Sequence, residues 1–227
     1  MDRAEARRLL ARHAEARAVL LERISAQAAA DGRSLWQVGS FAKGGADDWS
    51  DLDLVVTGGP CLLGEAVLVR DDPSNGPVGG GYLAAVHLTG PLLVGVDWYT
   101  WPGESPLPAE AGLLVGEDGR RGELPLSEAL DGLGRGARPD DGDPGVVALL
   151  MIPIVAKYLA RGDREVAAYL AGMLGGGLGE GLGGGRGGDG GVDLVGELRE
   201  ILRATAGPGR LIERIGLVLD VAVALRG

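Results

Sequence analysis

The sequence is poor in the side chains that many functional sites use. Its 227 residues include one cysteine, two histidines and one phenylalanine. The single cysteine, Cys61, excludes an intrachain disulfide, and without a nearby histidine it is not expected to act as a nucleophile. His13 and His87 have no partner at metal-ligand spacing, so each is interpreted as structural. The scarcity of cysteine and the lack of a signal-like apolar segment at the amino terminus predict a cytoplasmic protein.

Long hydrophobic runs and an excess of positive charge are also missing. The longest apolar run, Val146–Ala156, has 11 residues, whereas a membrane-spanning helix needs about 20. The net charge is −10, from 22 basic and 32 acidic residues, and a nucleic-acid-binding protein needs a basic surface to neutralise phosphates. We therefore expect neither a membrane nor a nucleic acid as a partner. The acidic balance is compatible with a polycationic small substrate, although it also serves solubility alone.

Glycine, in contrast, is abundant, with 42 of the 227 residues. An apolar fraction of 45% nevertheless excludes a wholly disordered chain. Many glycines gather in Gly175–Gly191, which we expect to be a flexible connection. Lysine is rare, because Lys43 and Lys157 are the only lysines among the 22 basic residues. A lysine kept in an arginine-rich chain is mildly informative, since its compact ammonium serves as a point charge beside a phosphate.

Hydrophobic periodicity predicts an α+β protein. Apolar residues recur every three to four positions over residues 3–30, which indicates an amphipathic helix. Further helices are predicted at residues 126–133, 144–161, 163–174, 194–206 and 211–225, and strands at 35–38, 52–56, 66–69, 82–88 and 92–99. The expected organisation is a domain of strands and helices over residues 1–105, a connecting segment over 106–143, and a C-terminal helical domain over 144–227 that contains the glycine-rich tract.

The most informative segment is residues 39–56, which reads GSFAKGGADDWSDLDLVV. Asp51 and Asp53 lie two residues apart on a predicted strand, so both carboxylates leave the same face. Close carboxylates repel each other, and Mg²⁺, which prefers oxygen ligands completed by substrate phosphates and water, removes that repulsion. Upstream, Gly39-Ser40 follows a predicted strand, where backbone N–H groups in a tight turn can bind an anion. This arrangement is typical of a nucleoside triphosphate site.

The Gly-Ser … Asp-x-Asp segment resembles the signature of the polymerase-beta-type nucleotidyltransferase superfamily. It is most similar to the bacterial antibiotic (aminoglycoside and lincosamide) nucleotidyltransferases and to the minimal nucleotidyltransferases. The resemblance implies a mixed β-sheet with flanking helices. It also implies attack by a substrate hydroxyl on the α-phosphate of a nucleoside triphosphate, expected to be ATP, with pyrophosphate leaving. The similarity is specific over residues 35–56, moderate over 92–99, and rests on layout beyond residue 100.

The resemblance also implies roles for single residues. The catalytic and metal-binding set is Asp51, Asp53 and Asp97, which would hold one or two Mg²⁺ ions. Asp97 is in addition a candidate general base. The implied nucleotide-binding set is Gly39, Ser40, Lys43, Ser50 and Lys157. Minimal nucleotidyltransferases often carry arginine at the position of Lys43, so the charge is kept here but bidentate phosphate binding is not. For Lys157, a solvated side chain on its helix is the alternative.

Aromatic residues, only 4% of the chain, follow Asp97 closely as Trp98, Tyr99 and Trp101. They could form a wall for the nucleotide base or the acceptor, or they could pack in the core. Both interpretations stay open on the sequence alone.

Three functions compete at this point. The first is transfer of a nucleoside monophosphate to a small hydroxyl-bearing acceptor such as an aminoglycoside, by an enzyme for which a homodimer would be unsurprising. The second is adenylylation of a protein by a toxin–antitoxin type enzyme, which the long helical C-terminal region disfavours. The third is a non-catalytic nucleotide-binding module, against which the intact Asp51, Asp53 and Asp97 argue.

Overall fold

The computed structural model describes residues 1–64, 66–138, 143–175 and 193–226, and the chain divides into two compact units. The sheet unit consists of His13–Gly90 and Val94–Asp140, and the helical unit consists of Met1–Arg12, Pro91–Leu93 and Asp141–Gly227. The tract 175–191, predicted to be flexible, lies outside the described residues except for Gly175, which ends α5 (Arg164–Gly175).

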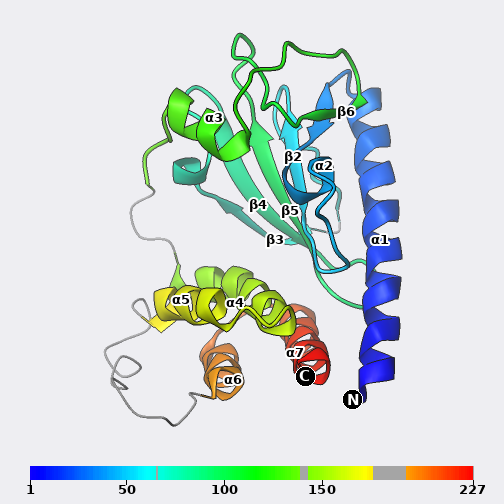
Figure 1. Ribbon diagram of the computed structural model, residues 1–227, viewed down its shortest axis with the longest axis vertical. Coiled ribbons are helices and arrows are strands. Elements are labelled where there is room, and N and C mark those ends of the chain that lie inside the picture. Colours follow the sequence, from blue (N-terminus) through cyan, green and yellow to red (C-terminus); the bar gives the residue numbers. More distant parts are fainter. Residues whose placement is uncertain (65, 139–142, 176–192, 227) are drawn as a thin grey trace. The chain divides into compact units, whose positions relative to one another are not determined.

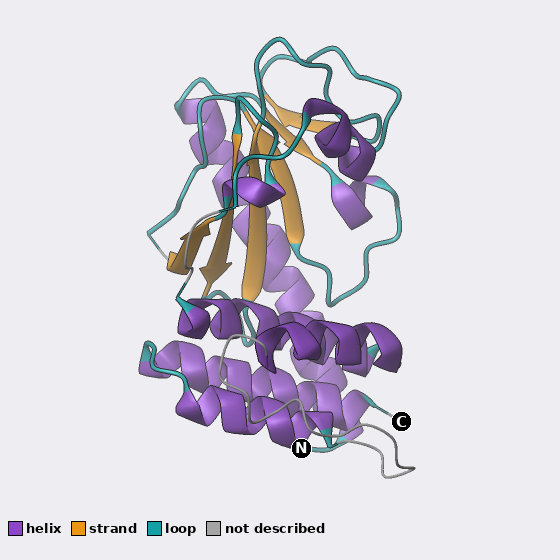
Figure 2. Cartoon of the chain, turned by 90° about the vertical axis from the view of Figure 1, so that its left-hand side faces the viewer, coloured by secondary structure: helices purple, strands orange, loops and turns teal. Residues whose placement is uncertain are grey.

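The described strands form one six-stranded mixed sheet (Figures 1 and 2). They are β1 (Leu35–Gln37), β2 (Leu52–Val56), β3 (Ala66–Asp71), β4 (Gly81–His87), β5 (Val94–Thr100) and β6 (Gly112–Val115), in the order β3-β4-β5-β2-β1-β6. β2 and β5 are parallel, and the other neighbours are antiparallel. The α+β class and a mixed sheet are therefore confirmed, and the two central strands are the ones on which the aspartates were predicted.

One face of this sheet packs against α1 (Arg3–Ala30), whose residues from His13 onward belong to the sheet unit. Leu20, Ile24 and Ala28 of α1 share a core with alternate residues of the central strands, among them Leu54 and Trp98. This alternation is the period-two pattern expected of a half-buried strand. The fully buried Trp98 is thus a core residue, which decides its role in favour of packing.

A second core lies on the opposite face. Its residues come from β1 and β2, from the segment after β5, and from α3 (Leu126–Leu133). The buried members are Trp36, Val38, Val55, Trp101, Leu107, Ala111, Leu126 and Leu130, with Tyr99 packed against them. Trp101 is therefore also a core residue. Both β6 and α3 arise from the predicted connecting segment, and they belong to the sheet unit.

The helical unit contains α4 (Pro144–Ala160), α5, α6 (Leu194–Ala204) and α7 (Gly209–Leu225). Helix α4 contacts the other three, which explains why it is apolar nearly all round. Asp143 caps its first turn by accepting a hydrogen bond from the Gly145 N–H at 2.8 Å. Pro153 lies inside α4, and the helix continues beyond it.

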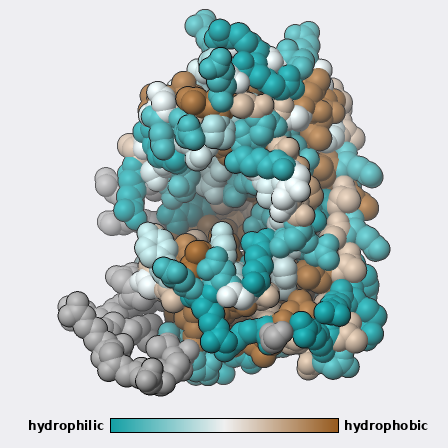
Figure 3. All heavy atoms as spheres, viewed as in Figure 1, coloured by the Kyte–Doolittle hydropathy of each residue, from teal (hydrophilic) through white to brown (hydrophobic). Residues whose placement is uncertain are grey.

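The predicted helices at 3–30 and 126–133 and the predicted strand at 52–56 have the observed bounds, and the other four predicted strands exist with ends shifted by one or two residues. Strand β6 was not predicted. Among the described helices, none combines the length and the apolar character needed to cross a membrane. In the sheet unit, the exposed large hydrophobic residues come from different elements, and hydrophilic side chains predominate at the upper end of Figure 3.

Candidate active site

The three predicted carboxylates share one face of the sheet. Asp51 directly precedes β2, Asp53 lies within it, and Asp97 lies within β5. In the parallel pairing of these strands Asp53 is the direct partner of Asp97, so their backbones are about 4.8 Å apart. The residues on either side of them, Leu52 and Val96 for example, point into the core under α1. The alternation that buries the apolar residues therefore presents the aspartates on the other face.

Gly39 joins the two halves of the sequence motif. It begins α2 (Gly39–Ala42) with φ +67°, a conformation that favours glycine. A Cβ at this position would overlap the carboxylate of Asp53, with Oδ2 as the nearest atom. The absence of a side chain at Gly39 thus allows the Asp53 carboxylate to lie directly against the turn that carries Ser40.

Gly95 plays the same part for Asp51. It lies on β5 two residues before Asp97, and a Cβ there would be 2.7 Å from Asp51 Oδ1. The Asp51 carboxylate therefore leans across the neighbouring strand over a position without a side chain. Gly39, predicted as a phosphate-turn residue, and Gly95, which the sequence analysis did not single out, each make room for one acidic group.

Tyr82, on β4, is a site residue that the sequence analysis missed. Its hydroxyl donates a hydrogen bond to Asp97 Oδ1 at 2.6 Å. Its ring lies 5.3 Å from that of its cross-strand partner Tyr99, measured between centroids, with the ring planes tilted at 58°. Burial, followed by the negative charge of Asp97, raises the pKa of both tyrosine hydroxyls well above the ordinary value. Tyr82 therefore stays protonated and remains a donor.

A cavity of about 350 Å³ opens beside these groups within the sheet unit. Its lining residues come from the turn at α2, from the loop before β4, from β4 and β5, and from α3 with the residues after it. They are Gly39, Lys43, Asn75, Tyr82, Tyr99, Leu126, Ser127, Leu130 and Arg135. Tyr99 thus faces the cavity, which leaves it in the role of a wall residue, unlike Trp98 and Trp101. The size suits part of a small ligand.

The predicted serines and lysines are placed differently from one another. Lys43, the residue that follows α2, lines the cavity, and its Nζ lies 3.3 Å from Glu110 Oε1. Ser40 lies in α2, next to Gly39. Ser50 is buried, and its hydroxyl donates to Asp47 Oδ1 at 3.0 Å. Its role in the structure is therefore to shape the loop before Asp51. Lys157 is buried in α4 of the helical unit.

Arg17 of α1 is the second residue that the sequence analysis missed. It is only 6% exposed, and its guanidinium donates to the carbonyls of Asp48 at 3.1 Å and Ser50 at 2.6 Å. The same group lies over the Phe41 ring at 4.7 Å from its centroid, in cation–π geometry. Arg17 therefore ties the α2 turn to the loop that delivers Asp51.

Burial lowers the pKa of Arg17, while the charges of Asp51, Asp48 and Asp47 raise it. A guanidinium remains charged in proteins all the same. A signal for this residue existed in the sequence, because it falls on the buried stripe of α1 between His13 and Leu20. A cation on an apolar helix stripe requires buried acceptors.

The donor chemistry of the site suits Mg²⁺, which takes hard oxygen ligands. Asp53 and Asp97 are opposite one another on adjacent strands, and Asp51 is on the same face. Within the part of the chain that the structure describes, however, no three His, Cys, Asp or Glu side chains form a ready cluster for a metal ion. Mg²⁺ is commonly held by one or two carboxylates plus phosphates and water. The residues therefore fit an ion that binds together with a phosphate-bearing substrate.

No known protein-family model matches the chain, and no curated protein matches it significantly. The functional argument consequently depends on the motif and on the geometry just described.

Proposed function

We propose that this chain is a magnesium-dependent nucleotidyltransferase of the polymerase-beta type. It would transfer a nucleoside monophosphate from a nucleoside triphosphate, ATP in the first instance, to a hydroxyl group of a small molecule. The observation that carries the proposal is the packing of the Asp53 carboxylate against Gly39, with Asp97 directly opposite on the parallel neighbour strand. A glycine turn that binds phosphates and a carboxylate pair that binds their counter-ion must adjoin in such an enzyme.

Each residue of the site has a proposed role in the reaction. The acceptor oxygen forms a bond to the α-phosphorus, the bond between that phosphorus and the bridging oxygen breaks, and pyrophosphate leaves. Asp97 would take the proton of the acceptor hydroxyl, and the hydrogen bond from Tyr82 to its Oδ1 supports this role by fixing the carboxylate. Mg²⁺ on the aspartates would neutralise charge on the phosphates. Most of this catalysis is positioning and electrostatics, which a small set of residues can supply.

The phosphate side of the site is formed by Gly39 and Lys43. Gly39 leaves the backbone of the α2 turn open to close approach. Lys43 offers a point charge at the cavity, because its side chain remains 52% exposed while its Nζ pairs with Glu110. Ser40 and the buried Lys157 remain proposed nucleotide contacts, and Ser50 acts by shaping the Asp47–Ser50 loop.

The test is transfer of label from an α-³²P-labelled nucleoside triphosphate, in the presence of Mg²⁺, to a panel of small hydroxyl compounds that includes aminoglycosides and lincosamides. We expect Asp53→Asn to lower the rate by about 10²–10³-fold, the range seen when a preorganised electrostatic group is removed. The matched control is Asp71→Asn, which removes an exposed strand aspartate at the end of β3.

Equal rates for Asp53→Asn and the parent would overturn the assignment of the site. Label found on a protein band rather than on a small molecule would instead support a protein-adenylylating enzyme. Tight binding of nucleotide with no transfer to any acceptor or protein would leave a nucleotide-binding module.

A further inference from the structure

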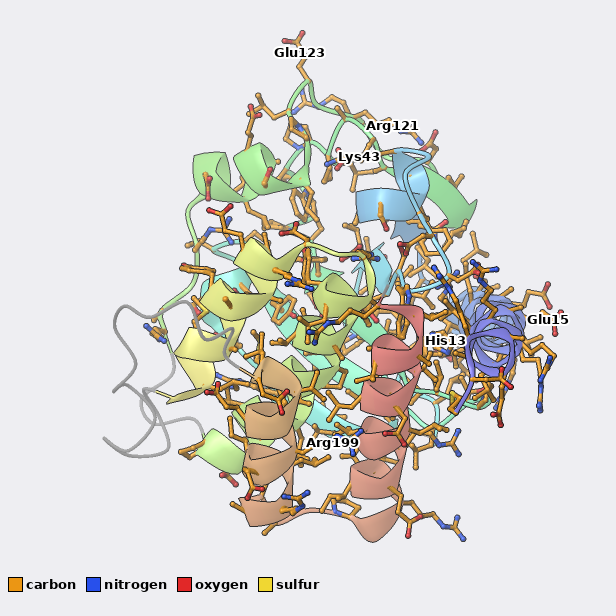
Figure 4. The ribbon with its side chains drawn as sticks, turned by 60° about the horizontal axis from the view of Figure 1, so that its bottom comes forward. His13, Glu15, Lys43, Arg121, Glu123 and Arg199 are labelled. Atoms are coloured by element: carbon orange, nitrogen blue, oxygen red, sulfur yellow. The ribbon has the colours of Figure 1, made fainter. Side chains whose placement is uncertain are left out.

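The charged residues that line the cavity of the sheet unit have the sign opposite to the net charge of the whole chain. Among the described residues that line it, the charged ones are both cations, Lys43 and Arg135, although the net charge of the protein is −10. Lys43 directly follows α2 (Figure 4), and Arg135 comes shortly after α3, so the two cations belong to separate segments. A concave site lined by one sign of charge concentrates ligands of the other sign.

The backbone of Arg135 is fixed in place. Arg135 forms an antiparallel β-bridge with Pro77, and the Gly136 N–H donates to the Gly76 carbonyl at 3.2 Å. A Cβ on Gly136 would lie 2.5 Å from the Pro73 carbonyl oxygen, so the two segments are in close contact. An arginine on a backbone held in this way presents its guanidinium to the cavity without the ordering that a free loop would require.

The present partner of Arg135 is readily exchanged. Its Nη2 lies 2.8 Å from Asp131 Oδ1, one turn back on α3, and the Asp131 side chain is 67% exposed. Exposed ion pairs of this spacing contribute little to stability, because water and salt screen them. A phosphate group, in contrast, accepts two parallel hydrogen bonds from a guanidinium. The Asp131 carboxylate therefore orders the Arg135 side chain, and a phosphate group can replace this carboxylate as its partner.

The neighbouring groups agree with an anionic ligand. Asp97 does not line the cavity. Tyr82 does line it, and its hydroxyl donates a hydrogen bond to the Asp97 carboxylate. Tyr99 and Leu130 offer apolar surface, and Asn75 and Ser127 offer neutral polar groups. Together these groups suit a ligand that has a flat or apolar part and a negatively charged group.

We propose that Arg135 is an anion-binding residue of this cavity, which recognises a phosphate group of the substrate together with Lys43. The phosphate can belong to the nucleotide or to a phosphorylated acceptor. A polycationic acceptor such as an aminoglycoside does not bind in this cavity. The inference rests on the proposed function for the identity of the nucleotide, but the anion site itself does not require that transfer occurs.

Binding is measured by titration calorimetry in EDTA, so that no metal contributes, with tripolyphosphate, ATP, adenosine, a sugar phosphate and kanamycin. We expect Arg135→Gln to weaken the phosphate-bearing ligands about tenfold, as for loss of a charged hydrogen bond, and Arg135→Lys to give an intermediate loss. Asp131→Asn, which removes the competing carboxylate, should strengthen tripolyphosphate binding. Arg121→Gln is the matched control, because Arg121 (Figure 4) forms a similar exposed pair with Asp118 and does not line the cavity.

The outcomes separate this inference from the proposed function. ATP and tripolyphosphate binding that depends on Arg135 assigns the nucleotide phosphates to the site, and dependence for the sugar phosphate alone assigns an acceptor. Unchanged binding of every anion by Arg135→Gln overturns the inference. Kanamycin binding that becomes tighter in Lys43→Gln also overturns it, because the polycation would then bind in this cavity. If transfer fails while anion binding depends on Arg135, the proposed function falls and the anion site stands. If transfer occurs and Arg135→Gln leaves every KM unchanged, the proposed function stands and the anion site falls.

Discussion

The two faces of the sheet come from the same strands and alternate residue by residue along β2 and β5. On the face under α1, Leu54 and Trp98 are fully buried in one core. On the other face, Asp53 and Asp97 are partly buried beside a cavity-lining tyrosine. The first face is stabilised by area removed from water, which many residue types supply. The second depends on particular pairs of groups across strands, each of which has few substitutes.

The faces therefore should respond differently to mutation. Loss of apolar volume on the α1 face should lower stability and leave the chemistry of the remaining folded protein intact. Loss of a carboxylate on the aspartate face should change activity far more than stability. Neighbouring residues on one strand, Leu54 and Asp53, allow the two effects to be measured side by side.

The largest change in stability is expected for Leu54→Ala. Leu54 is fully buried, so its truncation removes apolar contacts and leaves a cavity, at a cost of about 2–5 kcal/mol in the free energy of unfolding. Urea unfolding followed by circular dichroism measures this, and the KM for nucleotide is determined at a temperature where the variant is folded. A KM that rose as steeply as stability fell would show that the two faces are not independent. Asp53→Asn, at the neighbouring position, should lower activity strongly and change the free energy of unfolding much less.

Arg17 should give the next largest effect, because it links the two kinds of environment. Arg17→Met removes two charged hydrogen bonds, one to the buried Ser50 carbonyl and one to the part-buried Asp48 carbonyl, with an expected loss of about 1.5–3 kcal/mol. Because the loop it holds leads to Asp51, we also expect kcat to fall while the KM changes little. Arg17→Lys keeps the charge but not the two-pronged geometry, and it should restore part of kcat. A variant with lowered stability and normal kcat would make Arg17 purely structural.

Much of the fold was predictable because apolar periodicity is local. The helix at 3–30 and the strand at 52–56 follow from spacing alone, and both have the observed bounds. Strand β6, with the sequence GLLV, was missed because it is short, lies at the sheet edge, and occurs in a segment rich in glycine, proline and acids. Its pairing with β1 is a tertiary effect that no local pattern contains.

The site was predictable where its residues are close in sequence. The motif from Gly39 to Asp53 was found because its spacing is fixed by one turn and one strand. Tyr82 and Arg135 were missed because each reaches the site through the pairing of distant segments, β4 with β5 and Pro77 with Arg135. The register of such pairs depends on long-range packing, which the sequence does not display.

Gly39→Ala tests the junction between the two halves of the motif. The added methyl group meets the Asp53 carboxylate and also requires a positive φ, so we expect a loss of about 1–3 kcal/mol. Urea unfolding measures it in a cycle with Asp53→Ala, which removes the overlapping group. The double variant should lose less stability than the sum of the two single losses. Simple additivity would mean that the glycine conformation alone accounts for the effect.

The smallest effect is expected for Tyr82→Phe and is most visible in the pH dependence of stability. Loss of the hydrogen bond to Asp97 should lower the free energy of unfolding by about 1 kcal/mol at neutral pH. The pKa of Tyr82 is raised from 10.0 in the folded state, so above pH 10 the unfolded chain releases this proton first and the folded state loses stability. The parent should therefore lose stability more steeply above pH 10 than Tyr82→Phe does, with the Tyr99 contribution common to both. Tyr169→Phe, at an exposed position on α5, is the control. If the free energy of unfolding fell equally steeply above pH 10 in Tyr82→Phe and in the parent, Tyr82 would not contribute to the stability of the aspartate face.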